Sequence, residues 1–285
     1  MLVVHRRSEI RDWSGRARRA GERIGLVPTM GALHAGHTSL VPVAREGGAE
    51  RVVMSIFVNP LQFGPREDFD RYPRDLDRDL EVASAAEVDV VFAPTREEMY
   101  PSGEPIVRVV PTAGADRLCG RSRPGHFEGV LTVVAKLFGI TLPDVAVFGQ
   151  KDYQQLVLIR RMVTDLDFPV DVLAGPIVRE ADGLAMSSRN RYLSPSERSH
   201  ALALSAALRE CQEMFERGER DVAAYVRRLH EAGGPGVSVE YGEVVDPQTL
   251  QPALQVEAGT VCAIAAHVGA TRLIDNHILG TPLAF

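Results

Sequence analysis

The feature of this sequence that most constrains its fold is an alternation, over residues 1–175, between short apolar runs and longer amphipathic ones. The apolar runs are rich in valine and isoleucine and lack clean polar alternation, which is typical of strands buried on both faces. They lie at 24–28, 51–58, 88–93, 145–148 and 170–174. The amphipathic runs predict helices near 37–47, 75–86, 127–139 and 152–165. This alternation predicts an α/β fold, with a parallel sheet wrapped by helices.

The pattern changes after Pro176. Residues 193–218 predict a helix, since Ser194 can cap it, Pro195 suits its first turn and Glu197 completes a capping box. A second helix is predicted near 221–230, followed by strands at 237–246, 260–266 and 270–276. We therefore expect two domains, the first at 1–177 and a smaller α+β domain at 178–285.

Charge and composition narrow the classes of function. The net charge is −6, whereas general nucleic-acid binders usually carry a basic surplus, so DNA and tRNA are not expected partners. No apolar run approaches the roughly 20 residues that span a bilayer, and the start of the chain becomes charged by residue 5. The three cysteines have neither disulfide-framework nor zinc-site spacing. A cytoplasmic location without membrane contact is the expectation.

The segment VPTMGALHAGHTSL, residues 27–40, joins a predicted strand to a predicted helix through two glycines and two histidines. Parallel sheets bind ligands at the carboxyl ends of their strands, and glycines let the backbone approach a ligand closely. The helix start offers N–H groups, and His34 and His37 can donate hydrogen bonds to phosphate oxygens. The pattern indicates a nucleotide-phosphate site. The alternatives are a glycine-rich turn with two surface histidines, or a metal pair that lacks an obvious third ligand.

Two common nucleotide-binding signatures are absent from the sequence. There is no G-x-x-x-x-G-K-[ST] motif, which argues against a P-loop enzyme, and no G-x-G-x-x-G motif after a strand. The chain therefore lacks the usual signature of a dinucleotide-binding dehydrogenase.

Polar residues also follow the second and fourth predicted strands. Asn59 and Gln62 suit hydroxyl groups and a carboxylate, while the acidic run after them fits a solvated helix or supplies an aspartate for Mg²⁺. Lys151 can neutralise phosphate charge, or it can be solvated. Asp152 can meet a ribose or a metal, or it can simply cap the next helix.

Two loops complete the set of motifs. Residues 183–194, GLAMSSRNRYLS, offer hydroxyl groups and a guanidinium that can close over a triphosphate, or they form a polar linker. Residues 120–130, GRSRPGHFEGV, gather Arg121, Arg123 and His126, for which functional and solvated interpretations are equally supported.

The joint order of these stretches resembles the pantoate–β-alanine ligase family along nearly the whole chain. The matching segments are PTMGALHAGH, SIFVNPLQFG, YPR, RPGHFEGV, VFGQKDYQQL and MSSRN. The family belongs to the HIGH-motif nucleotidyltransferases, and residues 34–37 and 186–189 resemble its two ATP-gripping motifs. The resemblance implies a Rossmann-like first domain that holds both substrates, and a smaller α+β domain that brings the 183–190 loop over them.

The resemblance also implies a reaction. Pantoate and β-alanine would be condensed to pantothenate with ATP, through a pantoyl adenylate, releasing pyrophosphate and AMP. Mg²⁺ is expected to accompany ATP, and the protein is expected to be a homodimer, with strand 51–58 as a candidate for the subunit contact.

By position, the resemblance assigns site residues. Catalytic charge stabilisation falls to His34, His37, Lys151, Ser187, Ser188 and Arg189. ATP contacts fall to Pro28, Thr29, Met30, His37, Gly149, Lys151, Asp152, Val178, Met186, Ser187, Ser188 and Arg189. Pantoate contacts fall to Asn59, Gln62, Tyr72, Arg123 and Gln155. Of Asp77 and Asp79, the second is preferred as metal ligand.

Two other functions stay open on the sequence alone. One is an adenylyltransferase that moves AMP onto a phosphate and stops, although Gln62 and Gln155 fit a carboxylate better than a phosphate. The other is a non-catalytic nucleotide sensor on the same scaffold.

Overall fold

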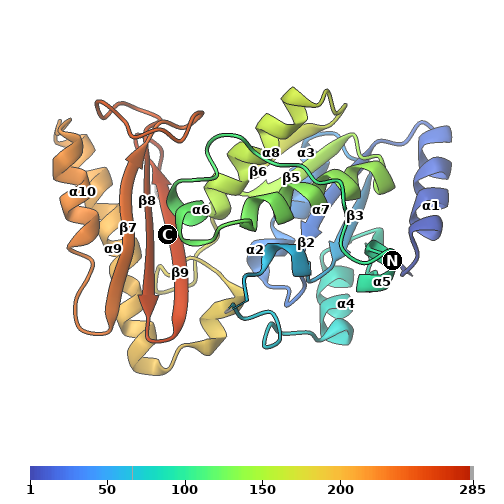
Figure 1. The fold of residues 1–285 in the computed structure, drawn as a ribbon, viewed down its shortest axis with the longest axis horizontal. Helices are drawn as coiled ribbons and strands as arrows, with labels where there is room; N and C mark the ends of the chain where they lie inside the picture. Colours follow the sequence, from blue (N-terminus) through green and yellow to red (C-terminus); the bar gives the residue numbers. More distant parts are fainter. Residues whose placement is uncertain (66, 283–285) are drawn as a thin grey trace. The chain divides into compact units, whose positions relative to one another are not determined.

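The computed structural model describes residues 1–65 and 67–282, and the chain divides into two compact units (Figure 1). The first unit consists of Met1–Ala113, Arg123–Gln150 and Leu158–Pro176. The second consists of Gly114–Ser122, Lys151–Val157 and Ile177–Phe285. Two short segments from the middle of the chain thus belong to the second unit, a connectivity that hydrophobic pattern does not reveal. The domain boundary expected after residue 177 stays a prediction.

The first unit is built on a six-stranded parallel sheet with the order β1-β4-β3-β2-β5-β6. Its strands are β1 (Leu2–Val4), β2 (Ile24–Thr29), β3 (Arg51–Ile56), β4 (Val90–Phe92), β5 (Val145–Gly149) and β6 (Asp171–Gly175). The predicted α/β class and all five predicted strands are confirmed. Strand β1 is an addition, because three residues are too few to give a periodic signal.

Helices cover this sheet. They are α1 (Arg7–Arg19), α2 (Ala35–Thr38), α3 (Leu40–Glu46), α4 (Leu76–Ala85), α5 (Arg96–Met99) and α7 (His126–Thr141), together with the 3-10 turn η1 (Pro60–Gln62). Val27, Met54 and Val147 pack in one core cluster with Leu40 and Ala44 of α3. The alternate strand positions are also buried, as expected for parallel strands covered on both faces.

The expectation that 51–58 contributes to a subunit contact stays a prediction, and the place of β3 in the sheet argues against it. It lies between β2 and β4, and both of its edges are hydrogen-bonded within the sheet. Four of its six residues are buried. A strand in this position has neither a free edge nor an exposed face to offer to another subunit.

The helix expected at 37–47 is present as two pieces, α2 and α3. Pro42 explains the break, because its ring lacks an N–H group and collides with the carbonyl four residues earlier, which belongs to Thr38. Thr38 is the last residue of α2, and Ser39 separates the two helices.

The second unit carries an antiparallel sheet of β7 (Val237–Val245), β8 (Val261–Val268) and β9 (Thr271–Ile278). Its other elements are α6 (Leu118–Ser122), η2 (Gln150–Asp152, from Lys151 on), the start of α8 (Tyr153–Asp165), η3 (Ser188–Tyr192), α9 (Pro195–Glu216) and α10 (Val222–His230). The α+β prediction and the capping box at Ser194 are confirmed.

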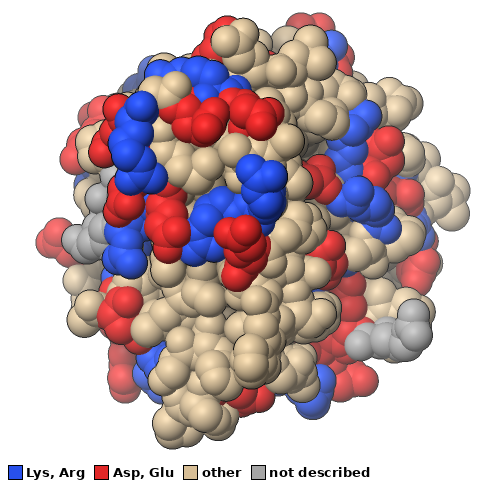
Figure 2. All heavy atoms as spheres, turned by 90° about the vertical axis from the view of Figure 1, so that its left-hand side faces the viewer, with Lys and Arg blue, Asp and Glu red and all other residues tan. Residues whose placement is uncertain are grey.

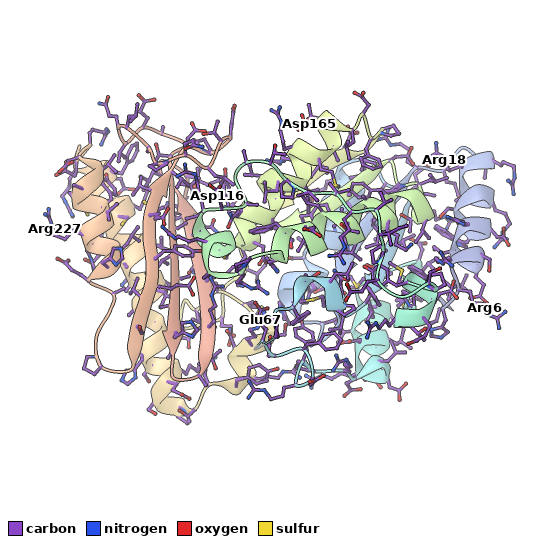
Figure 3. The ribbon with its side chains drawn as sticks, in the orientation of Figure 1. Arg6, Arg18, Glu67, Asp116, Asp165 and Arg227 are labelled. Atoms are coloured by element: carbon purple, nitrogen blue, oxygen red, sulfur yellow. The ribbon has the colours of Figure 1, made fainter. Side chains whose placement is uncertain are left out.

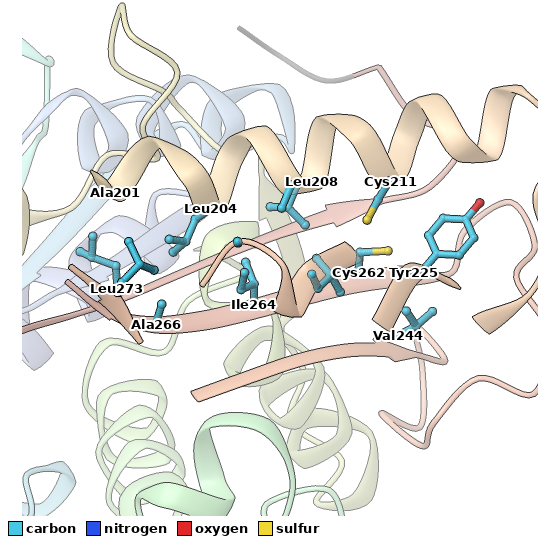
Figure 4. Close-up of a cluster of buried hydrophobic side chains, with 14 of the residues drawn as sticks. Ala201, Leu204, Leu208, Cys211, Tyr225, Val244, Cys262, Ile264, Ala266 and Leu273 are labelled. Atoms are coloured by element: carbon cyan, nitrogen blue, oxygen red, sulfur yellow. The ribbon is translucent and has the colours of Figure 1, made fainter. Parts of the chain in front are cut away.

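A single apolar cluster joins α9 to the sheet. Leu204, Leu208 and Cys211 of α9 face Cys262 and Ile264 of β8 (Figure 4). All three cysteines are free and buried, and Cys211 and Cys262 belong to this apolar cluster.

Further chain contacts tie the short segments of the second unit to its sheet. Cys119 in α6 lies 3.1 Å, sulfur to oxygen, from the Tyr241 hydroxyl on β7. Tyr153, at the start of α8, donates its hydroxyl hydrogen to the carbonyl of Pro247 at 3.0 Å. These contacts explain why 114–122 and 151–157 group with the C-terminal part of the chain.

The surface of the second unit has mixed charge. Figure 2 shows basic and acidic side chains interspersed on the face it draws. Arg228 pairs with Glu210 at 2.8 Å, and Arg217 with Glu213 at 3.7 Å. Over residues 1–65 and 67–282, we find no helix with the length and apolar character needed to cross a membrane.

Candidate active site

The strand order of the first unit singles out one edge of its sheet. From β2 the chain continues to β3 and β4 on one side, whereas β5 and β6 lie on the other. The order reverses between β2 and β5, and open α/β sheets bind ligands at the carboxyl ends of strands at such a point. The segments that leave β2, β3 and β5 carry most of the candidate residues of this unit.

The turn after β2 is held by one buried carboxylate. Asp79, in the first turn of α4, is 3% exposed and accepts hydrogen bonds from the backbone N–H groups of Ala32 at 2.9 Å and Leu33 at 2.7 Å. Gly31 has a φ of +81°, and a Cβ there would lie 2.7 Å from Asp79 Oδ2. The turn therefore requires glycine at 31 for both conformation and space.

Thr29 closes the base of the same turn. Its hydroxyl donates to the carbonyl of Ser55 on β3 at 2.6 Å and accepts from the N–H of Gly31 at 3.2 Å. The end of β2 is thus fixed to its neighbouring strand before the turn begins.

The two histidines lie side by side. Their ring centroids are 4.1 Å apart, with an interplanar angle of 31°. His34 is the N-cap of α2, and its Nδ1 accepts a hydrogen bond from the N–H of Gly36 at 3.1 Å. A nitrogen that accepts carries no proton, so the neutral ring of His34 holds its proton on Nε2. That tautomer can donate to an anionic ligand.

The turn after β3 is organised around Asn59, which is 1% exposed. Its amide donates to Gln62 Oε1 at 3.0 Å and to the carbonyl of Gly129 at 3.1 Å, and its Oδ1 accepts from the hydroxyl of Tyr100 at 2.8 Å. The Gln62 amide nitrogen lies 3.3 Å from the sulfur of Met30. Met30, after β2, and Gln62, after β3, are therefore in contact.

Tyr100 and Gly129 are site-supporting residues that the sequence does not reveal. Tyr100 lies 41 positions from its partner Asn59, and a Cβ on Gly129 would lie 2.3 Å from the carbonyl oxygen of Leu61 in η1. Such long-range contacts leave no local signal. The only local hint of a close contact was Gly129 itself, a glycine inside a predicted helix.

Arg123 holds the end of η1 through hydrogen bonds. Its guanidinium donates to Glu67 from Nε at 2.8 Å, to the carbonyl of Gln62 at 3.3 Å and to His126 Nε2 at 2.9 Å. His126 in turn donates from Nδ1 to the same Gln62 carbonyl at 2.8 Å. Burial works to raise the pKa of Glu67, labelled in Figure 3, but the hydrogen bonds and charge of Arg123 outweigh it and the pKa is lowered.

Two other predicted residues have clear surroundings. Tyr72 is buried and packs edge-on against Phe63, with ring centroids 6.0 Å apart. At Gly149, the last residue of β5, no described atom lies within 4 Å of where a Cβ would be. Packing therefore does not explain the glycine, and its assignment as an ATP contact stays a prediction.

The second unit holds the remaining predicted residues. Asn276 of β9 donates to the carbonyl of Lys151 at 2.8 Å, and Gln155 lies half-buried in the first turn of α8. Asp152 is exposed, between the lysine and the helix.

Residues 178–186 of this unit form a tight hairpin. The N–H of Met186 donates to the carbonyl of Val178 at 2.9 Å, and Arg179 bridges Ala185. The next residue, Ser187, caps η3 by accepting from the N–H of Arg189 at 3.3 Å. Ser188 and Arg189 thus begin a short 3-10 turn directly after the hairpin.

No preformed metal cage is found among residues 1–65 and 67–282, since no three His, Cys, Asp or Glu side chains converge there. Mg²⁺ at nucleotide sites needs only one or two carboxylates besides phosphate oxygens. Both carboxylate oxygens of Asp79 accept backbone N–H groups, a geometry that suits an anchor for the turn. Its assignment as a metal ligand stays a prediction.

Comparison with known proteins gives consistent matches over the full chain. A family model described as pantoate-beta-alanine ligase matches residues 2–278. A pantothenate synthetase of Moorella thermoacetica is 53% identical over 283 residues, covering 98% of this chain and 99% of that protein. One from Nocardioides sp. is 54% identical over 282 residues, covering 96% and 84%.

Solved structures agree with this. The crystal structure of pantothenate synthetase from Thermus thermophilus has a TM-score of 0.91 and 48% identity, covering 98% of this chain and 99% of that one. The pantoate-beta-alanine ligase of Francisella tularensis, complexed with beta-gamma ATP and beta-alanine, has a TM-score of 0.82 and 33% identity, covering 100% of both chains.

Proposed function

This chain belongs to the pantoate-beta-alanine ligase family, and we propose that it joins pantoate to β-alanine with ATP through a pantoyl adenylate. The observation that carries the proposal within the structure is the convergence of the turns after β2 and β3. Met30, in the turn after β2, contacts Gln62 in the turn after β3, and Gln62 pairs with Asn59. The adjacent rings of His34 and His37 follow Met30 in the same turn.

The proposed chemistry has two steps. A carboxylate oxygen of pantoate attacks the α-phosphorus of ATP, and the bond to pyrophosphate breaks. The amine nitrogen of β-alanine then attacks the activated acyl carbon, AMP leaves, and the nitrogen gives its proton to solvent. No protein nucleophile is needed, so the protein contributes by aligning the reactants and stabilising developing negative charge.

Each unit contributes residues to this chemistry in the proposal. In the first unit, His34 donates from Nε2 to a phosphate oxygen, with His37 beside it, while Gln62 and Asn59 hold pantoate. In the second unit, Lys151 meets phosphate charge as pyrophosphate leaves. The hydroxyl groups of Ser187 and Ser188 and the guanidinium of Arg189 bind the triphosphate. Gln155 is assigned to pantoate.

Supporting roles follow from the contacts. Arg123 is engaged by Glu67, Gln62 and His126, so we propose that it shapes η1 and that any pantoate contact is secondary. Mg²⁺ is proposed to arrive on the ATP phosphates, where it neutralises charge.

We also propose that the protein is a cytoplasmic homodimer. Ile106, Val107 and Val110 are 101%, 81% and 60% exposed, an unusual grouping of large apolar side chains in one short segment. The N–H of Val109 donates to Thr132 of α7 at 3.1 Å, so the backbone is held while these side chains face outward. Three free cysteines are consistent with a reducing compartment.

The decisive experiment is incubation of the full chain with ATP, Mg²⁺, pantoate and β-alanine, followed by mass analysis. We expect pantothenate and AMP in equal amounts, and neither product when pantoate is left out. Pyrophosphate release without an amide product would favour the adenylyltransferase instead.

His34→Ala separates catalysis from nucleotide sensing. We expect a large fall in turnover, because the donor to the phosphate is lost. Unchanged turnover with weakened ATP binding would contradict the catalytic role of this histidine. ATP binding by the wild type without any acyl adenylate would favour the sensor.

A further inference from the structure

Three consecutive buried polar residues interrupt the apolar character of the second unit's sheet. Asp275, Asn276 and His277 of β9 are 4%, 3% and 4% exposed, and their partners on β8 are apolar. A buried polar group costs free energy unless it is hydrogen-bonded, so the partners of these side chains show what the strand holds in place.

Asp275 anchors the hairpin 178–186, which precedes residues 187–189, called here the serine loop. Its carboxylate accepts two hydrogen bonds from Arg179, at 2.6 Å from Nη1 and 3.1 Å from Nη2, and both side chains are 3% exposed. Arg179 also donates to the carbonyl of Gly183 at 3.2 Å, across the hairpin. The paired guanidinium and carboxylate planes fix orientation as well as distance.

This ion pair also fixes the start of the serine loop. Arg179 and Ala185 form an antiparallel β-bridge, and the N–H of Met186 donates to the carbonyl of Val178 where the hairpin closes. Asn190, at the other end of the serine loop, donates to the carbonyl of Ala185 at 3.0 Å and to Glu180 at 2.6 Å. Residues 187–189 are therefore held at both ends by the element that Asp275 anchors.

Asn276 holds a different segment. Its Nδ2 donates to the carbonyl of Lys151 at 2.8 Å. Successive side chains of a strand point to opposite faces, so Asp275 and Asn276 reach in opposite directions from adjacent positions. One rigid strand is thus tied to the backbone of the lysine and to the hairpin of the serine loop.

We propose that Asp275 and Asn276 are positioning residues that set the spacing between Lys151 and Ser187–Ser188 for adenylate formation. The inference rests on the proposed function of those three residues. Charge that develops on the triphosphate must meet the ammonium group and the hydroxyl groups at once, and a displacement of about 1 Å can cost on the order of 10²-fold in rate. A strand that fixes both backbones removes that freedom before ATP binds.

The test uses two variants of the full chain. Asn276→Leu keeps the side-chain volume but removes the donor to Lys151, and Asp275→Asn keeps the shape but weakens the grip on Arg179. We expect each to lower kcat for pantoate-dependent pyrophosphate release by about 10-fold, since the loop and the lysine lose their fixed spacing. The KM for pantoate should change less than twofold.

His277→Gln is the matched control. His277 lies on the same strand and is equally buried, and its Nε2 contacts Gln212 of α9 at 2.9 Å. It feels the charge of Arg179, but its side chain hydrogen-bonds neither to Lys151 nor to residues 178–190 among the described contacts. We expect its kcat to stay within twofold of wild type. A similar loss of kcat in all three variants, or no loss in folded Asn276→Leu and Asp275→Asn proteins, would overturn the proposal.

Amide hydrogen exchange separates this inference from the function itself. Exchange should rise at 151–153 in Asn276→Leu and at 178–190 in Asp275→Asn, and at neither segment in His277→Gln. If the wild type made no pantothenate, the proposed function would fail on its own account. The exchange pattern would then still decide whether β9 holds these two segments, and uniform exchange across the variants would refute that.

Discussion

At the scale of single residues, the turn after β2 depends on a carboxylate that is remote from it in the chain. Asp79 satisfies two consecutive backbone N–H groups that the turn after β2 would otherwise bury without partners. An unsatisfied buried donor costs about 1–3 kcal/mol, so the carboxylate stabilises both the fold and the position of the histidines that follow.

We expect Asp79→Asn to lower the free energy of unfolding by about 1–3 kcal/mol and to raise the KM for ATP several-fold. The amide offers an oxygen to one N–H group but turns its own donor toward the other. Urea unfolding and kinetics with varied ATP measure the two effects. Asp77→Asn is the control, because Asp77 is exposed in the same first turn of α4. Recovery of the ATP KM at high Mg²⁺, with stability unchanged, would favour a metal ligand instead.

A second residue-scale prediction concerns acid stability. Burial lowers the pKa of His277 to about 4, and the positive charge of Arg179 adds to the shift. Between the unfolded pKa of about 6.5 and this value, only the unfolded chain takes up the proton, so stability falls as the pH falls. We expect a loss of about 2–3 kcal/mol from this group between pH 7 and pH 4.5.

Urea unfolding at both pH values tests the histidine. His277→Gln should remove this part of the pH dependence while the rest remains. Identical pH dependence in the variant and the wild type would show that the imidazole is not the titrating group.

The sequence revealed residues with suitable side-chain chemistry, but not the residues that hold them in place. The two histidines follow Gly31 and flank Gly36 at a strand end, and that local pattern was sufficient to single them out. Asp79 was preferred over Asp77 as a metal ligand on the resemblance alone. Its contacts to the turn span 46 and 47 positions, so no local pattern reports them. Asp275 and Asn276 lie still farther from their partners.

At the scale of elements, α7 and η1 meet through a glycine. The helix approaches the turn so closely at Gly129 that the carbonyl of Leu61 occupies the space of a Cβ. The position of Gln62, one residue on, therefore depends on the absence of a side chain in the helix.

We expect Gly129→Ala to displace η1, to destabilise the protein by about 1–3 kcal/mol and to raise the KM for pantoate. Thermal unfolding and kinetics with varied pantoate provide the measurements. Gly139→Ala in the same helix meets no described atom within 4 Å, and we expect it to stabilise the protein by up to about 1 kcal/mol. Equal effects at both positions would argue against a tight helix–turn contact.

Element prediction succeeded where apolar residues were large and failed where they were small. The valine-rich strands were visible as runs, whereas α1 is rich in arginine and buries only Ile10, Ser14 and Ala17. Serine and alanine give little hydrophobic signal, so the helical spacing of these three residues passed unnoticed. The break between α2 and α3 depends on Pro42, which the prediction of a single helix from apolar spacing did not take into account.

At the scale of the whole molecule, the proposed homodimer can be tested at the exposed segment 106–110. We expect Ile106→Asp/Val107→Asp to convert the proposed dimer to monomers in sedimentation velocity, because charged side chains would replace the proposed apolar contact. Circular dichroism should be unchanged, since both side chains are exposed. Leu254→Asp, at a side chain that is 101% exposed, is the control. A dimer that persists would place the interface elsewhere.

The division into units was predictable only in outline. A change from alternating strands and helices to helices followed by strands placed the transition near residue 177. That 114–122 and 151–157 join the later unit follows from contacts such as Cys119 with Tyr241 and Tyr153 with Pro247. These contacts are set by tertiary packing, which a linear pattern does not encode.

The interleaved connectivity also determines the order in which the two units can be completed during synthesis on the ribosome. Every segment of the first unit has been translated by Pro176, whereas Gly114–Ser122 and Lys151–Val157 must wait until β7, β8 and β9 emerge. During that interval the nascent chain displays surfaces such as Cys119 and Tyr153 that only the finished sheet can cover. Surface that is exposed in this way during synthesis is prone to aggregation, which chaperones counteract.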